Sequence, residues 1–214
     1  MNKSIAVLGM GRFGKRLTDK LIELGADVLI ADNDSEVVAE YADEVSYAAT
    51  ADLTSAEAIA ELDLSNMDTV VVTMGANLEA SIMCVMISKE LGVPEIIAQV
   101  STPRMETICR KLGADKVIYP EEEAANATAR KLVSNNFIDY FELNDELSIV
   151  NLHPKEEWIG KSLIKLKLRD RYGINVIAVR KDDNFNTRVD PQAPLTSDMD
   201  LLVIANSKEL DELL

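Results

Sequence analysis

Short apolar runs alternate with longer amphipathic segments from Ser4 to Tyr119 of this chain. The apolar runs are Ser4–Leu8, Asp27–Ala31, Val45–Ala49, Asp68–Thr73, Ile96–Val100 and Lys116–Tyr119, and the amphipathic segments are Phe13–Leu24, Ser35–Tyr41, Ala56–Leu62, Asn77–Leu91 and Arg104–Leu112. This alternation is typical of strands and helices in turn, which form a parallel sheet with helices on both faces. Gly25, Gly92 and Gly113 each follow an apolar helical stripe and are predicted to end a helix.

The pattern changes after Asn136. Before this point, Pro120 and three glutamates predict a helix to Asn135, because proline suits a first helical turn and acids face the positive end of the helix dipole. Beyond it we expect a compact α+β unit with a short helix at Lys161–Leu168 and strands at Ile138–Leu143, Leu147–Leu152, Ile174–Arg180, Thr187–Val189 and Leu201–Ala205. The sequence therefore predicts one domain at 1–135, a linker at 136–144 and a second domain at 145–214.

The glycine pattern GxGxxG at positions 9–14 follows the first predicted strand directly and opens the first helix. Gly9 permits a tight turn, Gly11 lets a phosphate approach the backbone, and Gly14 allows close packing of helix on strand. Asp32 ends the second predicted strand, where an acid binds the hydroxyl pair of a ribose. A glycine turn with a helix-capping acid is the alternative, but the context favours a Rossmann nucleotide site.

Two charges near the glycines bear on the ligand. Asp32 would repel a 2′-phosphate, and its neighbours Asn33 and Asp34 offer no arginine to bind one, so NADP is disfavoured. Arg12 opposes the dipole of the first helix unless an anion lies between them. Its side chain therefore either binds a terminal phosphate or extends into solvent, and the sequence leaves both open.

Two further loops, at 50–53 and 73–77, are predicted to meet at the same sheet edge. Asp52, beside Leu53, can accept from an adenine amino group, while Ala76 and Asn77 open a helix beside the phosphates. Helix or turn capping explains Asp52 and Asn77 equally well.

Charge and rare residues exclude several function classes. The net charge of −15 repels a phosphate backbone, which excludes nucleic acid as a partner. An acidic surface is either simply a soluble one or a docking face for a basic protein. Cys84 and Cys109 lie isolated in helical patterns and are predicted to be buried, and His153 has no clustered ligands. The chain thus has little equipment for metal or acid–base catalysis, and we expect no enzyme.

No secretory signal opens the sequence, and no apolar stretch approaches the roughly 20 residues needed to span a bilayer. We therefore expect a cytoplasmic protein whose membrane role, if it has one, comes through a partner.

Five stretches along nearly the whole chain carry a family resemblance, namely 6–14, 75–77, 111–115, 119–121 and 168–178. In these stretches the chain resembles the RCK, or TrkA/KtrA-like, regulatory subunits of Ktr and Trk potassium uptake systems. The resemblance implies an RCK_N Rossmann domain followed by an RCK_C ligand-binding and dimerisation domain. It also implies a membrane-embedded potassium transporter subunit as partner, self-assembly from dimers to an octameric ring, and a place at the inner face of the cell membrane.

The resemblance further implies that the first domain binds ATP, ADP or NAD(H), with Arg12 at the terminal phosphate of ATP. The residues implied to bind this ligand are Gly9, Gly11, Arg12, Phe13, Gly14, Asp32, Asn33, Asp52, Leu53, Gly75, Ala76, Asn77 and Gln99. Gln99 stands where several relatives have lysine, and this departure weighs against a preference for ATP. Glu121 matches a divalent-cation position for Mg²⁺ or Ca²⁺, although the start of a helix explains it from sequence alone.

Cyclic di-AMP is the ligand that the resemblance implies for the second domain. The candidate residues are Leu163, Ile164, Leu168, Arg169, Asn175, Val176 and Pro191. Apolar side chains would sandwich the adenines, and Arg169 and Asn175 would supply polar contacts. From the sequence pattern alone, Ile164, Leu168 and Val176 are core positions, so their role at the ligand is implied only by the resemblance.

Two alternative functions stay open. The first is an NAD-dependent oxidoreductase, because a Rossmann fold hosts many chemistries. The second is an RCK-type regulator of a different membrane transporter or channel, since specificity for an ion lies in the partner.

Overall fold

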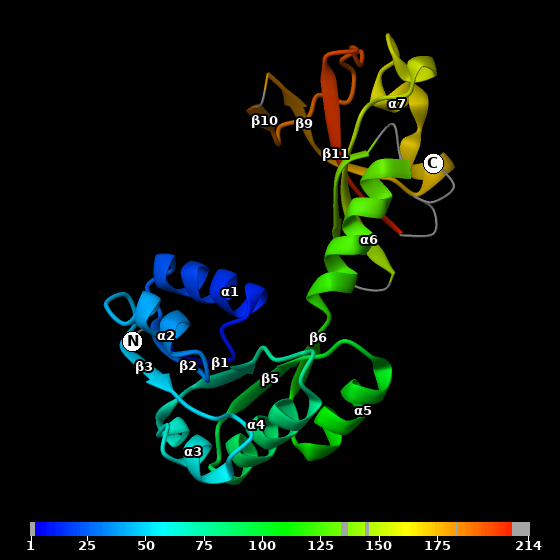
Figure 1. Ribbon diagram of the computed structural model, residues 1–214. Helices are drawn as coiled ribbons and strands as arrows, with labels where there is room; N and C mark the ends of the chain where they lie inside the picture. Colours follow the sequence, from blue (N-terminus) through cyan, green and yellow to red (C-terminus); the bar gives the residue numbers. More distant parts are fainter. Residues whose placement is uncertain (1–2, 134–136, 144–145, 183, 207–214) are drawn as a thin grey trace. The chain divides into compact units, whose positions relative to one another are not determined.

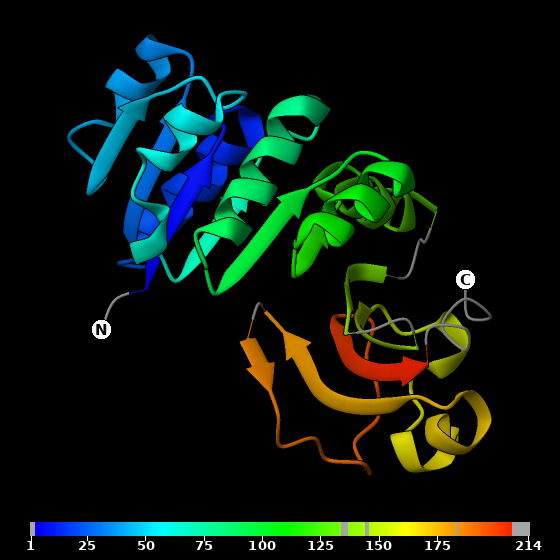
Figure 2. The ribbon, with the colours of Figure 1, turned by 90° about the horizontal axis from the view of Figure 1, so that it is seen from below.

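The computed structural model describes residues 3–133, 137–143, 146–182 and 184–206. Contacts divide the chain into two compact units, Met1–Glu122 and Glu123–Leu214. The helix α6 (Pro120–Val133) crosses this division. The boundaries that we propose from the sequence, 1–135, 136–144 and 145–214, instead keep α6 with the first domain. Figures 1 and 2 show a sheet in each unit.

The first unit contains a six-stranded parallel sheet with the strand order β3-β2-β1-β4-β5-β6. Its strands are β1 (Ser4–Leu8), β2 (Asp27–Asp32), β3 (Tyr47–Thr50), β4 (Thr69–Val72), β5 (Glu95–Gln99) and β6 (Lys116–Ile118). This is the order of a Rossmann sheet, so the predicted α/β fold is confirmed. The strand order reverses at β1 and β4, because β2 and β3 lie on one side of β1 while β4, β5 and β6 lie on the other. This reversal opens a crevice at the carboxyl ends of β1 and β4.

Helices cover both faces of this sheet (Figure 1). The helices are α1 (Arg12–Glu23), α2 (Ser35–Tyr41), α3 (Ala56–Ala60), α4 (Leu78–Glu90) and α5 (Pro103–Leu112), with a 3₁₀ turn at Leu64–Asn66. Because neighbouring strand residues point to opposite faces, Val7 packs against α1 and α2 while Leu8 packs against α3, α4 and α5. Both faces are therefore buried, as a parallel sheet requires.

Details of the first unit follow the sequence closely. Gly25, Gly92 and Gly113 all adopt positive φ just past a helix, as predicted. Cys84 and Cys109 are buried and free, as predicted, and burial raises the pKa of the Cys84 thiol to about 12. These thiols are packing groups rather than nucleophiles.

The second unit contains a five-stranded antiparallel sheet with the order β10-β9-β11-β8-β7. Its strands are β7 (Phe137–Glu142), β8 (Leu147–Leu152), β9 (Asn175–Lys181), β10 (Asn184–Asn186) and β11 (Met199–Asn206). A 3₁₀ turn at Glu156–Trp158 and two short helices, α7 (Leu163–Leu166) and α8 (Leu168–Tyr172), complete it. Trp158, Leu166 and Leu201 lie in its core.

Two predictions for the second unit are wrong. The strand expected at Thr187–Val189 lies at Asn184–Asn186, directly after a turn in which Asp182 has a φ of 50°. All three strand residues are exposed, so no apolar alternation marks them. The single helix expected at Lys161–Leu168 is broken at Lys167, which has a φ of 48°. Leu166 and Leu168 could not share one face of a continuous helix, and the break lets both reach the core.

We expect Leu201→Ala to lower the free energy of unfolding of the second unit by about 2–5 kcal/mol, because Leu201 is fully buried and its truncation leaves a cavity. Trp158, the one tryptophan of the chain, reports this unit by its fluorescence in a urea titration. Ile164→Ala is the matched control, since Ile164 is 55% exposed. Equal midpoints for the two variants would contradict the assigned core.

Candidate functional site

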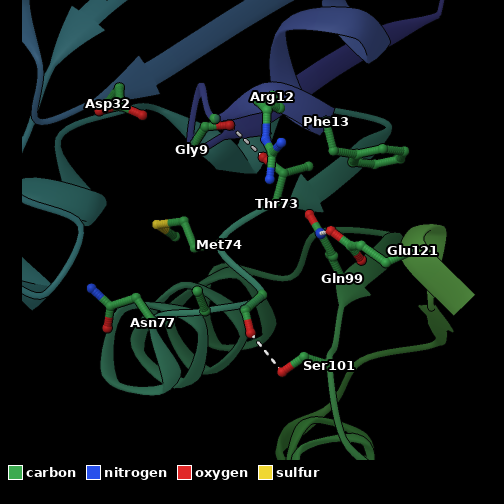
Figure 3. Close-up of a pocket in the computed structure, with 13 residues that line it drawn as sticks. Gly9, Arg12, Phe13, Asp32, Thr73, Met74, Asn77, Gln99, Ser101 and Glu121 are labelled. Carbon is green, nitrogen blue, oxygen red and sulfur yellow. Dashed lines mark hydrogen bonds between the residues drawn. The ribbon is translucent and has the colours of Figure 1, made fainter.

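A pocket of about 580 Å³ opens at the carboxyl ends of the parallel strands (Figure 3). Its walls come from the loop after β1, the end of β2, the loop after β4, the end of β5 and the start of α6. The residues that line it are Gly9, Gly11, Arg12, Phe13, Asp32, Thr73, Met74, Gly75, Ala76, Asn77, Gln99, Ser101 and Glu121. Ten of the sequence-predicted residues for this unit therefore meet in one place.

The three glycines of the loop differ in their surroundings. Gly9 has a φ of +99°, and a Cβ on it would lie 2.5 Å from Met74 Cγ. A Cβ on Gly14 would lie 2.1 Å from the carbonyl oxygen of Gly9, so α1 packs directly on the turn. Gly11 has no atom within 4 Å of a Cβ position, and it lines the pocket. Gly14 therefore lets α1 pack on the glycine turn, while Gly11 leaves the backbone open to a ligand in the pocket.

The first turn of α1 directs backbone N–H donors toward the pocket, because the first amides of a helix have no intrahelical partner. Gly11 is its N-cap and gives no side-chain cap, and the first turn carries no acidic residue. The first intrahelical bond that closes on Gly11 comes from the amide of Lys15. The helix therefore presents unpaired N–H groups and the positive end of its dipole toward the pocket, which suits an anion such as a phosphate.

Asp32 fixes the glycine loop to β2. Its carboxylate accepts a hydrogen bond from the amide of Met10, and it accepts a second at 3.0 Å from the amide of Asp34. Each oxygen takes one of these bonds and keeps a further lone pair for a hydroxyl donor. Asp32 is partly buried and lines the pocket, so a ribose has the acceptor that the sequence predicted.

Thr73 and Ser101 hold the pocket loops together and were not among the predicted site residues. Thr73 Oγ1 lies 3.0 Å from the carbonyl of Leu8 and also contacts the carbonyl of Gly9. Ser101 Oγ donates to the carbonyl of Gly75 at 3.0 Å (Figure 3). These hydroxyls, like Met74, lie just after parallel strands, and that position is the signal that could have identified them.

A smaller hollow of about 160 Å³ adjoins Asp32 and brings together the predicted Asn33, Asp52, Leu53 and Asn77. Thr54 donates to Asp52 through its amide at 2.9 Å and its hydroxyl at 2.7 Å, and these bonds lower the pKa of the Asp52 carboxyl. Asn77 accepts at 3.1 Å from the amide of Ala80 and caps α4. The capping alternatives that the sequence left open are thus both present.

Gln99 and Glu121 meet at the far side of the pocket (Figure 3). Gln99 Nε2 donates to Glu121 Oε1 at 3.1 Å. Among the described residues, no three His, Cys, Asp or Glu side chains gather in a way that could hold a metal ion. Glu121 would therefore need oxygens from a ligand or a second copy of the chain to bind Mg²⁺ or Ca²⁺.

The second unit has its own pocket, of about 510 Å³. It is lined by all seven residues predicted for its ligand, namely Leu163, Ile164, Leu168, Arg169, Asn175, Val176 and Pro191, and also by Lys167, Asp170 and Ile174. Leu168 and Ile174 are buried, while Ile164 and Arg169 are exposed. The core position that the sequence pattern predicts is therefore confirmed for Leu168 and wrong for Ile164. The amide of Ile164 donates to the carbonyl of Pro191 at 3.2 Å, which ties α7 to the loop before β11.

Comparison with known proteins settles the family. The TrkA-N domain family matches residues 5–120, and the TrkA-C domain family matches residues 147–214. The chain belongs to the TrkA-N/TrkA-C family. The resemblance predicted from the sequence is therefore confirmed.

Two relatives of this TrkA-family chain come from Bacillus subtilis. It is 39% identical to the Ktr system potassium uptake protein C over 85% of the chain and 82% of that protein. It is 32% identical to the Ktr system potassium uptake protein A over 97% of the chain and 93% of that protein. These matches cover both structural units.

Solved structures share the fold. The crystal structure of the GsuK RCK domain matches 100% of this chain with a TM-score of 0.65 at 17% identity, and the chain spans about half, 47%, of that protein's length. The GsuK channel bound to NAD matches 98% of this chain with the same TM-score, over 38% of its own length. Within the described residues of this TrkA-family chain, every helix is too short or too polar to cross a membrane.

We expect Gly14→Ala to lower the free energy of unfolding of the first unit by about 1–3 kcal/mol, because the new methyl group would overlap the Gly9 carbonyl. Gly11→Ala is the matched control in the same motif. It meets no atom within 4 Å and changes only the N-cap, at a cost below about 1 kcal/mol. Thermal unfolding followed by circular dichroism compares the two, and equal losses would contradict the packing role of Gly14.

Proposed function

We propose that this protein is the cytoplasmic regulatory subunit of a potassium ion transporter, controlled by ATP, ADP or NAD(H) in the first unit and by cyclic di-AMP in the second. The observation that carries the proposal is the uncapped N-terminus of α1, which faces a pocket with Asp32 at its edge. The potassium transport system is inferred from the two relatives, which are Ktr system potassium uptake proteins. The GsuK channel, which shares the fold, has been solved bound to NAD.

The proposed nucleotide crosses the edge of the sheet. Its phosphates lie on the open backbone at Gly11 and accept from the N–H groups of α1. Its ribose hydroxyls donate to Asp32, whose charge disfavours a 2′-phosphate and hence NADP. Arg12 is exposed at the first helical position and can reach a terminal phosphate.

The transporter is the proposed membrane-embedded partner, and the chain is proposed to assemble with copies of itself, from dimers to an octameric ring. Regulation then requires no covalent bond to be made or broken. A nucleotide that binds two arrangements of the ring unequally shifts their populations by its differential affinity, and the partner responds to the shift. Glu121 is the proposed contact for an accessory Mg²⁺ or Ca²⁺ that bridges phosphate oxygens.

An oxidoreductase is the alternative that shares the pocket. No His, Lys or Tyr is among the described residues that line it, so proton transfer would fall to carboxylates or Arg12. Incubation with NADH and candidate carbonyl substrates tests this alternative, and turnover at the nicotinamide absorbance would favour it. Co-purification of a transporter for another ion would instead favour an RCK-type regulator of that protein.

We expect Gly11→Asp to abolish binding of ADP and NADH, because the carboxylate would occupy the approach of the pyrophosphate and repel it. Isothermal titration calorimetry with each ligand measures this, and Gly11→Ala shows how much of the effect comes from bulk alone. Unchanged ADP affinity in Gly11→Asp would contradict the nucleotide site.

For the second unit we expect Arg169→Ala to weaken cyclic di-AMP binding about ten- to hundredfold, the usual effect of losing a charge-assisted hydrogen bond to a phosphate. Arg171→Ala is the control, because it removes the same charge from the same helix without lining the pocket. The measurement is calorimetry with cyclic di-AMP. Equal affinities for both variants would remove Arg169 from the site.

A further inference from the structure

Gln99 has a buried oxygen with no hydrogen-bond partner. The residue is only 6% exposed, and within the described residues Oε1 meets no donor. The orientation of the amide follows from its neighbour, because the Glu121 carboxylate can only accept and therefore takes Nε2. The acceptor oxygen is consequently left without a protein donor among the described residues, on a side chain that lines the pocket. Buried acceptors in native proteins are almost always paired, so this one requires an explanation.

Neither of the two hydroxyls in the pocket wall supplies the missing donor. A Cβ on Gly75 would lie 3.1 Å from Gln99 Cγ, so the side chain packs against bare backbone. The Ser101 hydroxyl already donates to the carbonyl of Gly75, and the Thr73 hydroxyl is directed to carbonyls of the β1 end. The Gln99 amide is thus packed in place, and its Oε1 has no hydrogen-bond donor among the described residues.

The place of Gln99 in the sheet indicates what part of a ligand reaches it. Asp32 ends β2, the glycine loop follows β1, and Gln99 ends β5, two strands beyond β1. Neighbouring strands lie about 4.8 Å apart, so Gln99 is about 10 Å from the phosphate loop, on the side away from Asp32. A nucleotide with its ribose at Asp32 and its phosphates at the loop therefore extends its far end toward Gln99.

We propose that Gln99 Oε1 accepts a hydrogen bond from the distal half of a dinucleotide, and that Gln99 thereby selects NAD(H) over ATP. A distal ribose offers hydroxyl donors and a nicotinamide offers an amide N–H donor. The terminal phosphate of ATP presents only acceptor oxygens, which a carbonyl oxygen repels. This inference rests on the nucleotide-binding function proposed above and adds the residue that distinguishes its ligands.

Calorimetry of the full chain with ADP, ATP, ADP-ribose and NADH, without divalent cations, tests the proposal. We expect the wild type to bind NADH at least about tenfold more tightly than ATP. Gln99→Leu, which keeps the bulk but removes the acceptor, weakens NADH about tenfold and leaves ADP unchanged, because ADP has no distal half. A matching loss for ADP-ribose assigns the donor to the ribose, and a loss for NADH alone assigns it to the carboxamide.

Gln99→Lys provides an independent test, because a cation at this position reverses the preference toward ATP. If the ratio of NADH affinity to ADP affinity is the same in Gln99→Leu as in the wild type, the proposal is overturned. ADP binding in that case would still support the nucleotide site. A gain in ATP affinity on addition of Mg²⁺ that Gln99→Leu removes would also overturn it, since the oxygen would then serve a cation. Failure of all four ligands to bind would overturn the proposed function as well.

Discussion

The contact between α1 and the turn before it is the constraint on which the site depends. A side chain at Gly14 would overlap the carbonyl of Gly9, so only a glycine lets the helix begin this close to β1. That approach brings the unpaired N–H groups of the first helical turn to the edge of the sheet. Met10 then donates its amide to Asp32, which joins the phosphate side of the pocket to the ribose side.

The parallel sheet supplies the rest of the pocket without specialised loops. Successive strands end at one edge, so residues far apart in sequence meet there with little conformational cost. Ser101 and Thr73 tie neighbouring strand ends together through backbone carbonyls. Gln99 and Glu121 close the far side. Hydrogen bonds between strand ends thus join the walls of the pocket, and Gln99 and Glu121 form its distal wall.

The sequence predicts the first unit well because local rules decide most of it. The glycine spacing, Asp32 and the strand–helix alternation each carry their own physical reason. Local rules do not predict Thr73 and Ser101 as site residues, because their roles depend on strands that are neighbours only in the folded sheet. The second pocket was predicted from resemblance alone. The sequence predicts neither the helix break at Lys167 nor the position of β10, because a left-handed residue and an exposed strand leave no hydrophobic pattern.

Hydrogen–deuterium exchange of the full chain with and without NADH tests the central claim, a nucleotide on the N-terminus of α1, most directly. Free amides in the first turn exchange rapidly, and a bound phosphate would protect them. The account predicts protection in 9–14 and 73–77, with 163–176 unchanged. Protection confined to 163–176, or no protection at saturating NADH, would contradict it.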